Sequence, residues 1–269
     1  MPEARIFDYP HYRSLDESRI VHLRGILAAW KQQLGLETAI DVGCGVGQFS
    51  AFLHELGFRT IAVDGRADNA EEARHRAPGV EVHIVDVEDQ AIQQLGSFDL
   101  VFCFGLLYHL ENPFRSIRNL YKLTGKILMI ESMCVDEGGS SLHLRDEGRS
   151  EDQGLRHVAF YPTEACLVKM LYRAGFPTVH RFTRLPNHPD FRASWVRRKA
   201  RTMLVASQMP VESEVLTRAQ EPPTDPDPWR TMWTGVQEQM GRVGDFFAKP
   251  WPEKIASARR RMARTPGRG

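Results

Sequence analysis

The sequence predicts an α/β fold built on a doubly wound, mostly parallel sheet of seven strands. Between residue 38 and about residue 125, short apolar runs alternate with segments of helical periodicity, which is the pattern of β-α-β units. The first run leads directly into a glycine-rich turn, Asp41-Val42-Gly43-Cys44-Gly45-Val46-Gly47, and a helix is expected after it. With 269 residues, 42% of them hydrophobic, the chain can form one such core and a smaller appendage.

The elements follow from local patterns of apolar residues. Strands are predicted at residues 39–42, 59–63, 80–85, 100–104, 126–130, 179–183 and 202–206. Helices are predicted at 48–56, 67–76, 113–123 and 163–174, the last capped by Thr163. A further helix over 14–34 has Ser14 as its N-cap and Glu17 three residues later, which is a capping box. We expect this N-terminal helix to lie over the edge of the sheet or over a ligand cleft.

Three regions are predicted along the chain. Residues 1–37 form an N-terminal helical cap, 38–209 form the sheet domain, and 210–269 form a proline-rich linker followed by a helical, basic tail. The tail, which ends near Arg259-Arg260-Arg261, fits binding to RNA, an acidic partner or a membrane surface, or a solvated end. The polar stretch 135–161 is too long for an ordinary connection, so it is predicted to be a functional or disordered loop.

Composition excludes some classes of protein and leaves others open. The net charge of +1 carries no polyanion-binding signature. The four cysteines lie far apart without a C-x-x-C pair, which indicates reduced thiols, and no metal site is predicted. The sequence has neither a signal-peptide pattern nor an apolar run of about 20 residues, so a cytoplasmic protein without a membrane span is expected. The sequence is also compatible with a homo-oligomer.

Carboxylates end three successive predicted strands, at Asp41, Asp64 and Asp86. The carboxyl ends of parallel strands meet at one edge of a sheet, where ligands bind in open α/β folds. Asp64 lies 21 positions after Gly43, where an acidic side chain can accept hydrogen bonds from ribose hydroxyls. Each acid alone also fits a helix cap. Together they favour a ligand with a cationic centre, a ribose and an adenine, and the glycine spacing disfavours an NAD-dependent dehydrogenase.

The turn from Asp41 to Gly47, Asp64, Asp86 and the run 98–101 resemble the successive motifs of class I S-adenosylmethionine-dependent methyltransferases. The resemblance covers about residues 38–131 and implies a Rossmann-like fold with S-adenosylmethionine as the cofactor. It also implies that Gly43, Gly45 and Gly47 pass the methionine part of the cofactor, that Asp64 holds the ribose, and that Asp86 with Val87 meets the adenine. Asp41 and Phe104 are also predicted to bind the cofactor.

A narrower resemblance reaches about residue 183. Leu107-Tyr108-His109, Ile130-Glu131-Ser132 and the run 156–163 are similar to enzymes that transfer a carboxymethyl group to wobble uridine in tRNA. Those enzymes have a long N-terminal region, whereas this chain has little before its first strand. They also have a basic residue after the Tyr-His pair, where this chain has Leu110. We therefore expect a shared fold and lid without a shared substrate.

The fourth strand delivers an imidazole and a phenol to the same edge of the sheet. His109 is predicted to be the catalytic general base, because an imidazole titrates near neutrality; the alternative is a structural histidine. Tyr108 is predicted to orient the acceptor or line the sulfonium pocket, unless it only packs in the core. Arg156 and His157, in the expected lid, are predicted to bind substrate, although most exposed arginines have no such role.

These expectations support three functions. The first is O-methylation of a small-molecule or sugar hydroxyl, with a small-molecule or glycan acceptor as the partner. The second is modification of wobble uridine, with tRNA as the partner. The third is a noncatalytic, cofactor-binding scaffold, which the intact glycine turn argues against.

Overall fold

The computed structural model describes residues 5–193 and 198–224, and the described residues up to Pro222 belong to one compact unit. Its helices are α1 (Pro10–Gln33), α2 (Gln48–Glu55), α3 (Ala67–Arg76), α4 (Pro113–Leu123) and α5 (Glu164–Ala174), with short 3-10 turns η1 (Ile6–Asp8), η2 (Gln90–Leu95), η3 (Leu107–His109) and η4 (Pro189–Phe191). The main sheet contains β1 (Thr38–Val42), β2 (Arg59–Asp64), β3 (Glu81–Ile84), β4 (Phe98–Phe104), β5 (Thr124–Val135), β8 (Thr178–Phe182), β9 (Lys199–Ser207) and β10 (Leu216–Arg218).

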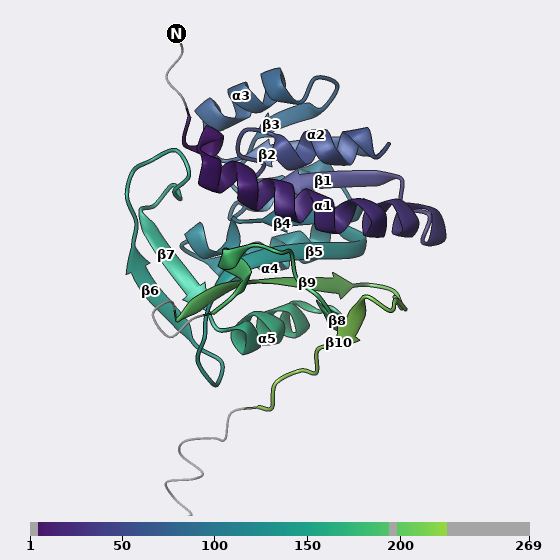
Figure 1. Ribbon diagram of the computed structural model, residues 1–269, viewed down its shortest axis with the longest axis vertical. Helices are drawn as coiled ribbons and strands as arrows, with labels where there is room; N and C mark the ends of the chain where they lie inside the picture. The colour runs from purple at the N-terminus through teal and green to yellow at the C-terminus, as the bar shows by residue number, and fades with distance from the viewer. Residues whose placement is uncertain (1–4, 194–197, 225–269) are drawn as a thin grey trace, which may run out of the picture. The chain divides into compact units, whose positions relative to one another are not determined.

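The strand order of this sheet is β10-β8-β9-β5-β4-β1-β2-β3. Strands β1 to β5 are parallel, while β9, β8 and β10 add antiparallel pairs at one side (Figure 1). The predicted α/β fold with a mostly parallel sheet is therefore confirmed, and every predicted strand is present. This sheet has one additional strand, because β10, which lies beyond the predicted end of the domain at residue 209, pairs with β8.

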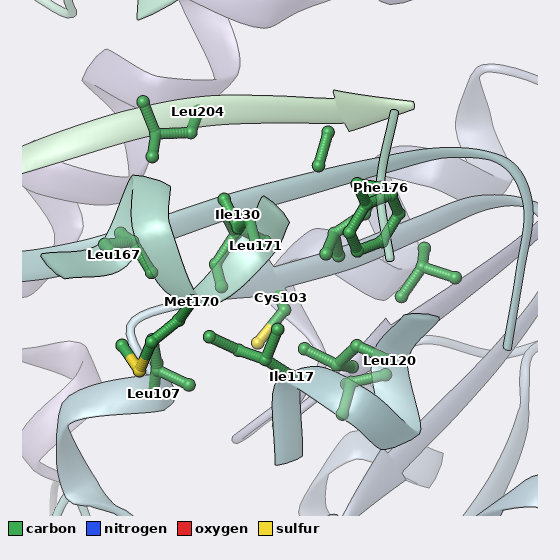
Figure 2. Close-up of a cluster of buried hydrophobic side chains, with 14 of the residues drawn as sticks. Cys103, Leu107, Ile117, Leu120, Ile130, Leu167, Met170, Leu171, Phe176 and Leu204 are labelled. Carbon is green, nitrogen blue, oxygen red and sulfur yellow. The ribbon is translucent and has the colours of Figure 1, made fainter. Parts of the chain in front are cut away.

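Side chains alternate strictly between the two faces of the central strands. On β4, Leu100 and Phe102 face α1 and α2, whereas Val101 and Cys103 face α4 and α5. Helices thus cover both faces of the sheet (Figure 1). On the side of α4 and α5, buried side chains that include Cys103, Leu120 and Phe176 form a hydrophobic core (Figure 2). This layering leaves the carboxyl ends of the parallel strands as the place where a ligand site can form.

The predicted capping box is wrong. Helix α1 begins at Pro10, four residues before Ser14, and the Ser14 hydroxyl donates to the carbonyl of His11 inside the helix (2.9 Å). Proline suits a first helical position because its ring presets φ and its missing N–H would be unpaired there anyway. By contrast, Thr163 caps α5 as predicted, accepting from Cys166 N–H (3.2 Å).

The long polar stretch contains a hairpin that periodicity did not reveal. Strands β6 (Leu142–Asp146) and β7 (Val158–Pro162) form a separate antiparallel pair. Residues 147–157 join them, and we call this connection the lid loop. The predicted helical tail falls mainly on residues 225–269, which lie outside the described residues. Over the described ranges, no helix is both long and apolar enough to cross a membrane.

Candidate functional site

A cavity of about 150 Å³ lies at the carboxyl ends of the parallel strands. Most of the residues predicted for the site line it: Gly43, Gly45, Asp64, Asp86, Val87, Phe104, Tyr108 and His109. The first turns of α1 and the lid loop complete the wall, so the N-terminal helix does lie over the cleft.

The glycine turn brings the backbone close to its neighbours. Gly43 has φ +74°, and a Cβ there would lie 2.7 Å from the Leu106 side chain. Gly45 has φ +52°, and a Cβ there would meet the ring of Phe7 at 3.4 Å. The turn is tied to β2, because Gly43 N–H donates to Val63 O (2.8 Å). A larger residue at Gly43 would therefore be strained and would also collide.

The two carboxylates at the ends of β2 and β3 differ in their surroundings. Asp64 is buried and accepts from Gly45 N–H and from Arg66 N–H, both at 2.8 Å. Burial raises the pKa of Asp64, while these hydrogen bonds oppose the rise. Asp86 is more exposed and accepts from Glu88 N–H (2.9 Å). Each carboxylate oxygen has a second lone pair, so Asp64 can still accept from hydroxyls in the cavity.

The end of β4 contributes an aromatic group and a titratable one. The ring centroids of Tyr108 and His109 lie 4.1 Å apart, and both residues line the cavity. Burial raises the pKa of Tyr108, so its phenol stays protonated near neutral pH and can orient a ligand without serving as a base. His109 Nδ1 is hydrogen-bonded to Glu147, a lid-loop residue whose side chain is 4% exposed.

A buried cluster of charges adjoins the wall of the cavity, which Arg19 and Arg201 line. Glu131, with no exposed surface, pairs with Arg19 (2.8 Å) and with Arg201 (2.9 Å). We call these three residues the arginine–glutamate cluster. The guanidinium of Arg201 also lies 5.5 Å from the centroid of the Tyr108 ring. The cluster therefore joins α1, β5 and β9 and fixes the surroundings of Tyr108.

The lid loop and residues 5–12 meet over the cavity. Arg5 Nε lies 2.8 Å from Glu151 Oε2, and Ile6 N–H donates to the same carboxylate. Tyr12 OH donates to Asp152 in the next position of the loop. Glu151 O also accepts from Asn69 Nδ2 on α3 (3.2 Å). These contacts hold two segments that are 140 residues or more apart in sequence against each other.

Four predicted site residues do not line the cavity. Gly47, with φ +85°, packs against α3, where a Cβ would lie 3.1 Å from Ala73. Arg156 has a 60% exposed side chain and lies 4.0 Å from Asp86 and 3.9 Å from Glu111, on an outer groove. His157 is exposed, with φ +58°, and its Nδ1 lies 3.2 Å from Gly148 O. In this structure His157 therefore belongs to the turn that ends the lid loop.

Asp41 is the fourth of these residues, and it lies behind the glycine turn. The carboxylate is 2% exposed and accepts from Ser50 Oγ on α2 (2.6 Å). Burial raises its pKa to about 7, although the bond from Ser50 opposes the rise. Asp41 thus links β1 to α2 beneath the site.

The raised pKa of Asp41 predicts a pH-dependent stability. Between about pH 4 and pH 7 the folded protein keeps a proton on Asp41 that the unfolded chain has lost, so raising the pH favours unfolding. In Asp41→Asn this contribution is absent. We expect the free energy of unfolding of the variant, relative to the wild type, to rise with pH across this window by up to about 1.4 kcal/mol per pH unit.

Urea unfolding of both proteins at several pH values measures this slope. Asp146→Asn, at an exposed position, is the matched control and should show no such trend. A stability difference for Asp41→Asn that does not change with pH would contradict the assignment.

Sequence reasoning missed several residues of the site. Tyr12, Asp16 and Arg19 come from the first turns of α1, where the pattern showed only an apolar stripe. The position of Glu131 could have been recognised as buried, because it continues the every-second-residue pattern of Ile127 and Met129, whose side chains face α1. A charged residue at an apolar position of a strand requires a buried partner. Nothing local indicated that this partner would come from positions 19 and 201.

Comparison with known proteins identifies the class of domain. Residues 40–126 match the family model described as a methyltransferase domain. The N-terminal domain of EvdMO1 with S-adenosylhomocysteine bound superposes with a TM-score of 0.61 at 21% identity, over 74% of this chain and 84% of that one. Magnesium protoporphyrin IX methyltransferase from Synechocystis PCC 6803 gives 0.52 at 19% identity, over 78% and 90%. The chain thus matches a methyltransferase domain over residues 40–126 and has the fold of S-adenosylmethionine-dependent methyltransferases.

Two relatives in sequence show what the chain resembles in more detail. It is 28% identical over 148 residues to the tRNA U34 carboxymethyltransferase of Pseudoalteromonas translucida, covering 53% of this chain and 45% of that protein. It is 37% identical over 97 residues to the ubiquinone biosynthesis O-methyltransferase of Xanthomonas axonopodis pv. citri, covering 34% and 41%. The predicted resemblance to the carboxymethyltransferases is confirmed at this modest identity. The chain matches less than half the length of either relative.

Proposed function

We propose that this protein is an S-adenosylmethionine-dependent methyltransferase that methylates a hydroxyl group of a small molecule or sugar. The observation that carries the proposal is the single cavity that joins the glycine turn and Asp64 to Tyr108 and His109. One end of this cavity suits a nucleoside, and the other holds a base candidate. The O-methyltransferase relative, at 37% identity over 97 residues, supports the choice of reaction.

The residues present fit this cofactor. Acidic side chains outnumber basic arginines on the cavity wall. The acidic residues are Asp16, Asp64, Asp86, Glu151 and Asp152, and the arginines are Arg19, Arg66 and Arg201. An acidic wall favours a cationic sulfonium. Gly43 leaves room that a Cβ would fill, and the Asp64 carboxylate can accept from a ribose. When bound, the cofactor supplies an activated methyl group.

The chain's own residues then have separate tasks. His109 would take the proton from the acceptor hydroxyl through Nε2, since Glu147 engages Nδ1. Tyr108, as a protonated phenol, would hold the acceptor in line. Glu151 and Asp152 would keep the lid loop closed and exclude water.

Calorimetry with S-adenosylhomocysteine tests the proposal directly. We expect the wild-type protein to bind it and to show no comparable binding of NADH. With labelled S-adenosylmethionine, transfer to members of a panel of phenols and sugars should follow. Tight NADH binding without binding of the homocysteine compound would overturn the proposal.

A second candidate is transfer to wobble uridine of tRNA. The 148-residue match to the carboxymethyltransferase supports it, because that match extends beyond the 87 residues or so of the cofactor motifs. Purified tRNA therefore belongs in the acceptor panel. Label in tRNA alone would favour this candidate over a small-molecule acceptor.

A further inference from the structure

We propose that Glu147 is the positioning residue of the site: it sets the tautomer of His109 and makes the base competent only while the lid loop is closed. The proposal rests on the proposed function, because it assigns His109 the role of base. It goes beyond that function by naming the group that directs His109 and by linking this group to the lid.

The contacts of Glu147 use both of its carboxylate oxygens. Oε1 is bonded to His109 Nδ1, and Oε2 accepts from Gly154 N–H (2.9 Å). The Glu147 side chain is 4% exposed and that of His109 is 13% exposed, so water does not compete freely for either. An ionised carboxylate only accepts hydrogen bonds, so Nδ1 carries the proton, and in the neutral imidazole Nε2 then presents its lone pair.

The same loop that carries Glu147 also covers the cavity. Gly154 packs so closely on the backbone of η3 that a Cβ would lie 2.1 Å from His109 O. Leu155 covers Gly65, and Glu151 binds Arg5. Movement of this loop away from the cavity would therefore remove Glu147 from His109. Closure of the site and orientation of its base are properties of one segment.

Glu147→Gln tests the tautomer without changing the shape of the side chain. In the wild type the two hydrogen bonds go to different oxygens, whereas a carboxamide has an oxygen at one of these positions and an NH₂ group at the other, so one of the two N–H donors would face the NH₂ group. The amide proton of Gly154 is fixed, whereas an imidazole can move its proton to the other nitrogen. The glutamine should therefore keep its oxygen on Gly154, donate to Nδ1 and force the proton onto Nε2. In that tautomer Nε2 cannot act as a base.

Long-range ¹H–¹⁵N correlation spectra of the histidine side chains, recorded without ligand at about pH 8, report the tautomer directly. A spectrum of His109→Asn assigns the signals. We expect the wild type to show the Nδ1–H form and Glu147→Gln the Nε2–H form. Asp146→Asn, the same exchange at the adjacent exposed residue, should match the wild type. An Nε2–H tautomer in the wild type, or an unchanged one in Glu147→Gln, would overturn the proposal.

Gly154→Ala tests the link to the lid while leaving the carboxylate intact. The added methyl group must push the loop off His109 O, so the Nδ1–H signal should be lost. Gly148→Ala is the control in the same loop, because a Cβ there meets nothing within 4 Å. An unaltered His109 signal in Gly154→Ala would show that the loop does not control the base.

Steady-state kinetics distinguish a role of Glu147 in positioning His109 from a role only in the structure of the lid loop. Glu147→Gln should lower kcat by about 10²-fold or more and leave the KM for S-adenosylmethionine unchanged, whereas a purely structural latch would raise KM. Glu147→Asp, which retains two acceptors, should recover part of the loss. Failure of the proposed function would appear as absent S-adenosylhomocysteine binding in the wild type, independently of the tautomer spectra.

Discussion

Glu131→Gln is expected to lower the free energy of unfolding by about 3 kcal/mol, the lower end of the cost of removing one partner from a buried ion pair, because Asp16 still pairs with Arg19 (2.8 Å) and Asp190 lies 3.5 Å from Arg201. Glu131 has no exposed surface, and it is the carboxylate between Arg19 and Arg201. Glutamine keeps the volume but leaves two buried guanidinium groups without that negative charge. The loss should appear in urea unfolding as a lower midpoint at an unchanged slope.

Glu137→Gln is the matched control. Its side chain is 37% exposed, and its pair with His143 is 3.3 Å long at the surface. Exposed pairs contribute about 0–1 kcal/mol, so this variant should unfold close to the wild type. If the two glutamine variants lost equal stability, Glu131 would not be the centre of the cluster.

The strands and most helices could be predicted because their causes are local. Leu100, Val101, Phe102 and Cys103 form an apolar run of strand length, and such a run has few alternatives when a turn follows it. The β6–β7 pair escaped prediction because both strands are short and the apolar side chains of β6 are exposed, as at Leu144. Those strands depend on pairing with each other, which periodicity in one segment does not report.

The residues of the candidate site also differ in whether local sequence patterns could predict them. Gly43, Asp64 and Asp86 were predictable because parallel strands must end at a common edge. Glu147 and Arg201 were not assigned, because contact with His109 and Tyr108 depends on the paths of the lid loop and β9. A larger share of the residues expected at the cofactor than of those expected at the acceptor therefore lines the cavity.

Asp64→Ala is expected to weaken S-adenosylhomocysteine binding by on the order of 10²-fold. Hydrogen bonds to a charged group contribute roughly 1.5–3 kcal/mol each, and about 1.4 kcal/mol is a factor of ten in affinity. The variant would lose the carboxylate proposed to accept from the ribose and would also release Gly45 N–H from its 2.8 Å bond. Calorimetry gives the dissociation constant, and a melt without ligand gives the accompanying loss of stability.

Asp99→Ala distinguishes binding from folding in this experiment. Asp99 also accepts from two backbone groups, Glu37 N–H (2.8 Å) and Thr38 N–H (3.0 Å), but it does so at the start of β4, at the opposite end of the strands. Its removal should lower the melting temperature and leave the affinity unchanged. If Asp99→Ala weakened binding as much as Asp64→Ala, the effect would come from a loosened fold, and the role of Asp64 at the ribose would have to be abandoned.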